Sequence, residues 1–204
     1  MKNNKKAFTL IELLAVLVIL GVLIGIAIPK VTQYINKSKK DGFVSTGSFF
    51  VETMKSDFTS EFYPLPIRNN DVTIVTFDLA NLDNKDKKSA FGGTYVNNKS
   101  YVAVVNVGTG VDPEYKYYVA MQDSKGYAFP LTNISSLTTD RIIANAKNKM
   151  EITIQPLCGT KDGYQKEYTE ISGLNDVQPK DELGNKINWK ATIYSGKGCT
   201  GINE

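Results

Sequence analysis

A single carboxylate stands inside the most apolar stretch of this chain. Glu12 lies in the run from Phe8 to Ile28, where Thr9 is the only other residue with a polar side chain. A carboxylate within a membrane helix is costly, so a simple anchor would favour leucine at this position. A free α-amino group on Phe8, four residues before Glu12, would supply the positive charge that lowers this cost. A cut just before Phe8 would create such an amino group.

The residue types of common catalytic sites form no recognisable pattern. The chain has no histidine, and it has neither a Gly-x-Ser-x-Gly sequence nor a phosphate-binding glycine loop. Any two of the 21 acidic residues could meet in the fold, but no spacing singles out a pair. We therefore expect no catalytic residues and no cofactor, and an exported enzyme remains only as an alternative.

Two cysteines, Cys158 and Cys199, lie near the carboxyl end with 40 residues between them. An even number of cysteines in an exported domain suggests a disulfide. Closing this loop would stabilise the fold by roughly 4 kcal/mol in the chain-entropy description. A pair of free thiols is the alternative. Two distant cysteines without histidine make a poor metal site, and Asp162, Asp176 and Asp181 lack the spacing of a calcium loop, so we expect no metal.

The element that positions Glu12 is the apolar run itself. As a helix, residues 8–28 are about 31 Å long, close to the roughly 30 Å of a bilayer core. An uncleaved signal anchor would have the same length. Gly21 and Gly25 form a Gly-x-x-x-Gly pair that could bring two such helices together. Pro29 either ends this helix or lets a longer helix bend.

After Pro29 the pattern remains helical but becomes amphipathic. Apolar residues recur at helical spacing and form one stripe, which consists of Phe43, Phe50, Val51, Met54, Phe58 and Phe62. Gly42 and Gly47 weaken a helix without ending it, whereas Pro64 and Pro66 should end it. We expect one helix of roughly fifty residues whose second half uses this stripe as core.

The remainder predicts strands and turns. Alternating and β-branched residues indicate strands at 72–79, 94–107, 115–122, 127–129, 150–155 and 187–194, with 94–107 folded as a hairpin that turns at Asn97-Asn98. Residues 139–147 predict a short helix capped by Thr138 or Thr139. We expect an α+β head in which an antiparallel sheet covers the helix stripe. Tyr164, Tyr168 and Trp189 are expected in its core, with surface contact as the alternative.

Charge gives no case for nucleic-acid binding. The net charge is +3, from 24 basic and 21 acidic residues, but three of the lysines (Lys2, Lys5 and Lys6) precede Phe8. Without them the two signs balance, so we expect no sequence-specific nucleic-acid partner. Lysines stand on both sides of the apolar run, so the positive-inside rule does not decide its orientation.

The sequence Ala7-Phe8-Thr9-Leu10-Ile11-Glu12, preceded by Lys5 and Lys6, resembles the class III signal of type IV prepilins and pseudopilins. The resemblance implies cleavage between Ala7 and Phe8 by the prepilin peptidase and N-methylation of Phe8. It also implies that Glu12 pairs with a neighbouring subunit's amino terminus and that Pro29 loosens the helix in the filament. Most members have glycine in place of Ala7; alanine is the next smallest residue, so we expect slower cleavage at worst.

The resemblance also implies the organisation of the whole chain. Residues 1–7 would be a leader, 8–29 a membrane and filament-core helix, 30–63 an amphipathic spine, and 64–204 a β-rich head with a disulfide loop at 158–199. Expected partners are the peptidase, other pilin subunits in a helical polymer, an inner-membrane platform with its ATPase, and membrane lipid before assembly.

The implied location is a single-pass membrane protein with a cytoplasmic amino terminus and an extracellular head, which then enters a surface pilus or an envelope pseudopilus. We expect a pilus subunit. The alternatives are a pseudopilin of a secretion or DNA-uptake machine, and a membrane-anchored binding protein or enzyme that does not polymerise.

Overall fold

The computed structural model describes residues 8–79, 88–96, 99–146 and 163–195. The chain divides into two compact units, Met1–Lys39 and Lys40–Glu204. Helix α1 (Leu10–Thr59) contributes its first part to one unit and its last part to the other. The fold class is α+β, as expected.

The second unit is built on a six-stranded sheet with the strand order β4-β3-β2-β1-β6-β5. The strands are β1 (Asp71–Thr76), β2 (Tyr101–Asn106), β3 (Tyr115–Gln122), β4 (Ala128–Asn133), β5 (Tyr164–Tyr168) and β6 (Trp189–Tyr194). Neighbouring strands are antiparallel except β1 and β6, which pair in parallel. The expected antiparallel sheet is therefore correct for every adjacent pair but one.

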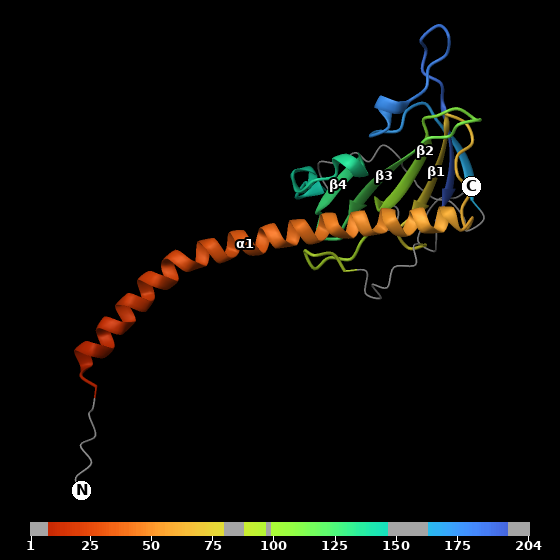
Figure 1. Ribbon diagram of the computed structural model, residues 1–204. Coiled ribbons are helices and arrows are strands. Elements are labelled where there is room, and N and C mark those ends of the chain that lie inside the picture. Colours follow the sequence, from red (N-terminus) through yellow and green to blue (C-terminus); the bar gives the residue numbers. More distant parts are fainter. Residues whose placement is uncertain (1–7, 80–87, 97–98, 147–162, 196–204) are drawn as a thin grey trace. The chain divides into compact units, whose positions relative to one another are not determined.

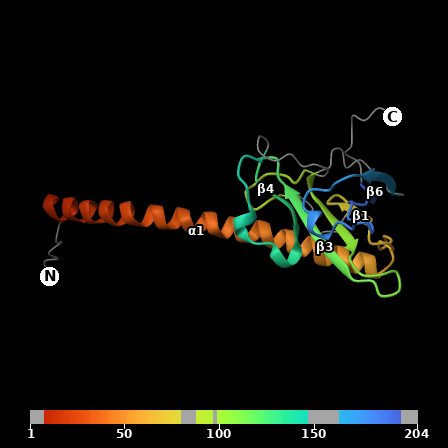
Figure 2. The ribbon, with the colours of Figure 1, turned by 90° about the horizontal axis from the view of Figure 1, so that it is seen from above.

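The last part of α1 packs along one face of this sheet (Figures 1 and 2). Its buried side chains are Phe43, Phe50, Val51, Met54 and Phe58. Phe50 and Phe77 meet edge to face with ring centroids 5.0 Å apart, and Phe43 meets Phe129 in the same way at 5.4 Å. The predicted stripe is therefore core, except for Phe62, which lies beyond the helix and is 73% exposed.

The opposite face of the sheet carries a second core that the helix does not reach. Alternate residues of β2 point into the two cores, so every residue of β2 is buried. Ile171 and Leu174, in the segment between β5 and β6, cover this second face. Trp189 is fully buried there, which confirms its expected place in the core, whereas Tyr164 is exposed.

Helix α1 ends at Thr59, earlier than the prolines predict. Its carboxyl end is a Schellman motif. The Phe62 N–H donates to the Asp57 carbonyl at 3.0 Å and the Glu61 N–H donates to the Phe58 carbonyl at 3.2 Å. Glu61 occupies the left-handed position of this motif with φ of 60°, where glycine is the usual residue. The motif ends the helix before the prolines can do so.

Strand β4 continues through Pro130, where the sequence predicts that the strand ends. β4 is an edge strand, and the register shifts between Val119 and Met121 of β3. Pro130 and Leu131 consequently oppose one residue of β3. A bulge in an edge strand tolerates a residue without an N–H donor, which explains the proline.

The helix predicted at 139–147 is wrong. Residues Thr139–Arg141 form a 3-10 turn, η3, in place of an α-helix, and Thr138 at its cap position makes no side-chain capping bond. Ile143 then pairs with Ala128 through two main-chain hydrogen bonds of 2.7 and 3.0 Å. Main-chain pairing at the start of β4 replaces the hydrogen bonds that a helix would supply. Ala146 is buried, as expected.

The hairpin predicted at 94–107 is also wrong. β2 pairs with β1 and β3, and Tyr95 instead forms a bridge with Asp123. The sequence does not predict strand β5, because most of its residues are polar. Its side chains are exposed or half-buried, as is common in an edge strand. The predicted turn at Asn97-Asn98 and the predicted strand at 150–155 lie outside the described residues.

Candidate assembly site

The part of α1 before Lys40 exposes apolar side chains on every side. Each large apolar residue from Phe8 to Val31 is exposed, and Phe8 is exposed at 87%. An α-helix that is apolar all round is normally buried among other helices or in a membrane. By length and composition, α1 could cross a membrane. This surface is therefore the strongest candidate for a functional site among the described residues.

Glu12 closes the start of this helix through a capping box with Thr9. The Thr9 N–H and hydroxyl both donate to Glu12 Oε2 at 2.8 Å, and the Glu12 N–H donates to Thr9 Oγ1 at 3.3 Å. The Thr9 carbonyl accepts the first helical bond, from the Leu13 N–H. Thr-x-x-Glu is the sequence signature of this motif. The sequence analysis treated Glu12 only as a charge and missed its capping role.

Phe8 lies just before the cap, so its main chain precedes the helix, which begins at Leu10. A peptidase that cuts before Phe8 would therefore act on chain outside the first helical turn. Ala7 and the rest of segment 1–7 lie outside the described residues, as do Cys158 and Cys199. Cleavage after Ala7 and the Cys158–Cys199 disulfide therefore remain predictions.

Pro29 does not end the helix, because α1 continues through it without a break. Proline has no N–H to donate to the Gly25 carbonyl, so one helical hydrogen bond is lost at this point. Three residues later, the Thr32 hydroxyl donates to the Ile28 carbonyl at 3.0 Å, a type of bond that often bends helices. The lost hydrogen bond lowers the cost of bending the helix at this point.

Gly21 and Gly25 leave open space on the apolar helix. A Cβ atom built on either glycine would have no neighbouring atom of this chain within 4 Å. Residues four apart lie on the same face of a helix, so the two glycines form one smooth surface. A close approach there would have to come from another molecule.

The acidic side chains of the head form no metal site among its described residues. No group of three His, Cys, Asp or Glu side chains in that part of the chain could hold a metal ion. Its buried carboxylate, Asp123, accepts hydrogen bonds from the Ser89 hydroxyl at 2.5 Å and from the Lys125 and Tyr127 N–H groups at 3.0 and 2.9 Å. These bonds hold the turn before β4, so the role of Asp123 is structural.

Comparison with known proteins identifies the same end of the chain. The family model described as the prokaryotic N-terminal methylation motif matches residues 2–28. The match includes Phe8, Thr9, Glu12 and most of the exposed apolar surface. None of the curated proteins and none of the solved structures gave a significant match.

Proposed function

Because this chain carries the N-terminal methylation motif of the type IV pilin and pseudopilin family, we propose that it is a structural subunit of a type IV pilus-like filament. The leader is removed after Ala7, and Phe8 is methylated. Copies of the chain then assemble through the exposed apolar part of α1. The protein has no enzymatic role in this proposal.

The observation that carries the proposal is the unshielded apolar surface of α1, most of which lies within the matched methylation motif. Fully burying one large apolar side chain stabilises an assembly by about 1.5–3 kcal/mol. Association costs about 4–15 kcal/mol, so the burial of several such side chains offsets it. Lipid covers this surface before assembly, and neighbouring copies cover it afterwards.

Glu12 fixes the axial position of one copy relative to the next and adds little to the stability of the assembly. Within one chain its carboxylate is bonded by Thr9, which makes a carboxylate in an apolar setting less costly. In the filament the methylated amino group of a neighbouring Phe8 pairs with it. Only one axial step between copies brings these two charges together, so other steps leave an unpaired charge in an apolar core.

The proposed route begins with a single-pass precursor whose amino terminus is cytoplasmic and whose head lies outside the membrane. The prepilin peptidase frees Phe8. A membrane platform driven by a cytoplasmic ATPase then moves subunits into the filament. The head is displayed on a surface pilus, where adhesion is the expected role.

The test is an intact, non-reduced mass of the protein sheared from whole cells. A mass of residues 8–204 plus one methyl group and minus two hydrogens is expected, from cleavage, methylation and the Cys158–Cys199 bond. The same processed mass confined to the membrane fraction would assign the chain to a pseudopilus. Retention of residues 1–7 would overturn the proposal, because the helix would then be a plain anchor.

Two variants separate the charge of Glu12 from its capping role. Glu12→Val removes both, whereas Glu12→Gln removes the charge and keeps a side chain that can complete the capping box. Both variants should be cleaved normally, and both should be depleted from the sheared filament. Normal incorporation of Glu12→Gln would show that capping alone matters, and the proposed charge pair would be wrong.

A further inference from the structure

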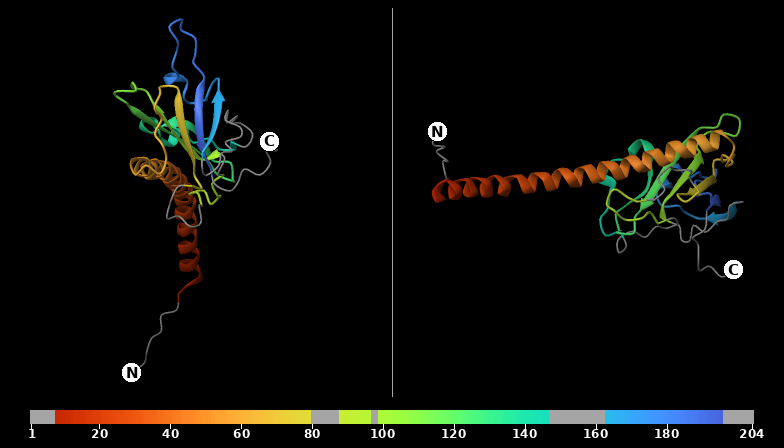
Figure 3. Two further views of the ribbon diagram at one scale, coloured as in Figure 1. Left: turned by 90° about the vertical axis from the view of Figure 1, so that its right-hand side faces the viewer. Right: turned by 90° about the horizontal axis from the view of Figure 1, so that it is seen from below.

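A short hairpin projects from the sheet between β5 and β6 (Figure 3, left, blue). Its stem is closed by a bridge between Lys180 and Lys186 and by the Ile187 N–H, which donates to the Pro179 carbonyl at 2.9 Å. The Asp181 carboxylate accepts from the Leu183 and Asn185 N–H groups at 2.9 and 2.8 Å. The hairpin is therefore held in one conformation by its own hydrogen bonds.

The tip of this hairpin carries one apolar side chain and one available carboxylate. Leu183 is 88% exposed, so it adds nothing to either core of the head. The neighbouring Glu182 is exposed and has no ion-pair partner within the described ranges. The Asp181 carboxylate is already used inside the turn, and Lys186 pairs with Glu170. Leu183 and Glu182 are the two groups that the tip can offer to another molecule.

A groove of about 490 Å³ lies elsewhere on the head, between the segment 64–68 and strands β1, β6 and β5. Its apolar lining includes Pro64, Leu65, Pro66 and Ile67. Ile67 is 73% exposed. The groove is large enough for a leucine side chain and the turn that carries it.

The charged lining of the groove has three basic and two acidic side chains. Arg68, Lys166 and Lys190 line it together with Asp71 and Glu167. One oxygen of the Asp71 carboxylate accepts the Arg68 N–H at 3.0 Å. Among the described residues, neither the Arg68 guanidinium nor the Lys190 ammonium has an ion-pair partner. These two cations are available to an incoming carboxylate.

We propose that the hairpin tip of one copy of this chain binds in the groove of the next copy. Leu183 packs on Pro64–Ile67, and the Glu182 carboxylate pairs with Arg68 and Lys190. Tip and groove are different surfaces, so the contact is heterologous, and a heterologous contact that does not close generates an open helical filament. The inference rests on the proposed function and adds a contact between heads to the contact between helices.

The test uses full-length protein in cells that assemble the filament. A photo-crosslinking residue at position 183 should join two copies, with the crosslinked peptide containing part of segment 64–68. The matched control is the same residue at position 111, because Val111 is 98% exposed on a different loop and should not label the groove. A crosslink from position 183 to any other site, or none in assembled filaments, would overturn the inference.

Exchanging the charges of Glu182 and Arg68 tests the same contact through the yield of sheared filament. Glu182→Lys and Arg68→Glu should each lower the amount of sheared filament about tenfold, and the double variant should return it to within about threefold of wild type. Unchanged yield in both single variants, or a double variant no better than either, would overturn the contact.

The processed mass of residues 8–204 separates this outcome from failure of the proposed function. In all three variants it should equal the wild-type mass corrected only for the substituted residues, because the leader and α1 are untouched. If wild type itself does not enter a filament, the function fails, and the head contact fails with it.

Discussion

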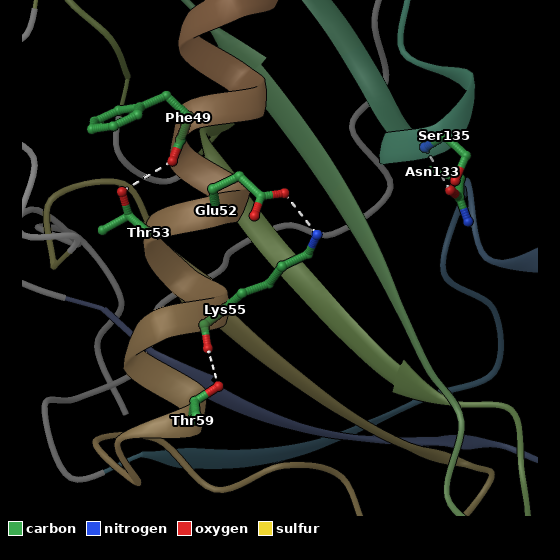
Figure 4. A network of polar contacts seen from close by, with 7 residues as sticks. All are labelled: Phe49, Glu52, Thr53, Lys55, Thr59, Asn133 and Ser135. Carbon is green, nitrogen blue, oxygen red and sulfur yellow. Dashed lines mark hydrogen bonds and ion pairs between the residues drawn. The ribbon is translucent and has the colours of Figure 1, made fainter.

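The two parts of helix α1 have opposite relationships to the rest of the chain. Before Lys40 the apolar side chains point in every direction and all are exposed, whereas after Lys40 most of them form one stripe that the sheet covers. The outer side of the second part is mainly polar, with Phe49 exposed on it. There Lys55 pairs with Glu52 at 2.7 Å, and the Thr53 hydroxyl bonds the Phe49 carbonyl (Figure 4). Apolar surface in the second part stabilises the fold, and in the first part it is left for association.

The glycines of the helix show the same difference. A Cβ on Gly47 would lie 2.7 Å from Phe129 Cζ and 3.3 Å from Met121 Sδ, so glycine lets the helix approach the sheet. Gly25 has no such neighbour. One glycine is required by the fold of this chain, and the other can matter only to a second molecule.

The largest contrast is expected from truncating one apolar side chain in each part. Phe50→Ala should lower the free energy of unfolding of the head by about 3–5 kcal/mol, since Phe50 is fully buried. Leu17→Ala should change it by less than about 0.5 kcal/mol, because Leu17 is exposed within its own chain. Urea unfolding in detergent, followed by fluorescence of the single Trp189, measures both. Equal effects would contradict the division into folding and association surfaces.

Alkaline pH should destabilise the head. Burial raises the pKa of Tyr95 from 10.0 to about 12, and burial likewise raises the pKa of Tyr168 to about 12. A raised pKa favours the neutral phenol in the folded state, so this stability is complete below pH 10 and is lost as the pH rises towards 12. For Tyr95 the free energy of unfolding should fall by about 2–3 kcal/mol over this pH range.

Urea midpoints of the Trp189 signal between pH 8 and pH 12 test this dependence. In Tyr168→Phe the alkaline loss should be smaller, because the substitution removes one of the titrating groups. Its hydroxyl has no hydrogen-bond partner among the described residues, so the variant should fold normally at pH 8. A midpoint independent of pH up to 12 would contradict the burial of these phenols.

The smallest contrast comes from adding one methyl group to each glycine. Gly47→Ala should destabilise the head by about 1–2 kcal/mol, because the clash with Phe129 outweighs the gain in helix propensity. Gly25→Ala should leave head unfolding unchanged, and any loss of sheared filament would then report packing between copies. A stabilised Gly47→Ala head would show that Phe129 moves aside at little cost.

The local features of this fold were readable in the sequence. Phe43, Phe50, Met54 and Phe58 recur at helical spacing, and the structure places all four in one core. Strand β3 has the predicted bounds, because its tyrosines and valine favour a strand. The capping box of Thr9 and Glu12 was equally readable, since it needs only residues three apart.

Features that depend on distant partners were not readable. Ile143 pairs with Ala128, Tyr95 pairs with Asp123, and Pro130 lies opposite a shifted β3, and in each case the conformation follows from the neighbouring strand.

The sequence by itself determined the long helix, its exposed apolar half, its buried stripe and the processing motif, because each is written in residues at most a few turns apart. Only the tertiary structure decided the strand order, the second core around Trp189 and the groove between segment 64–68 and strand β5. These features join residues about a hundred positions apart. The pairing of distant strands depends on the total apolar surface that the whole domain buries. A local sequence pattern does not contain that information.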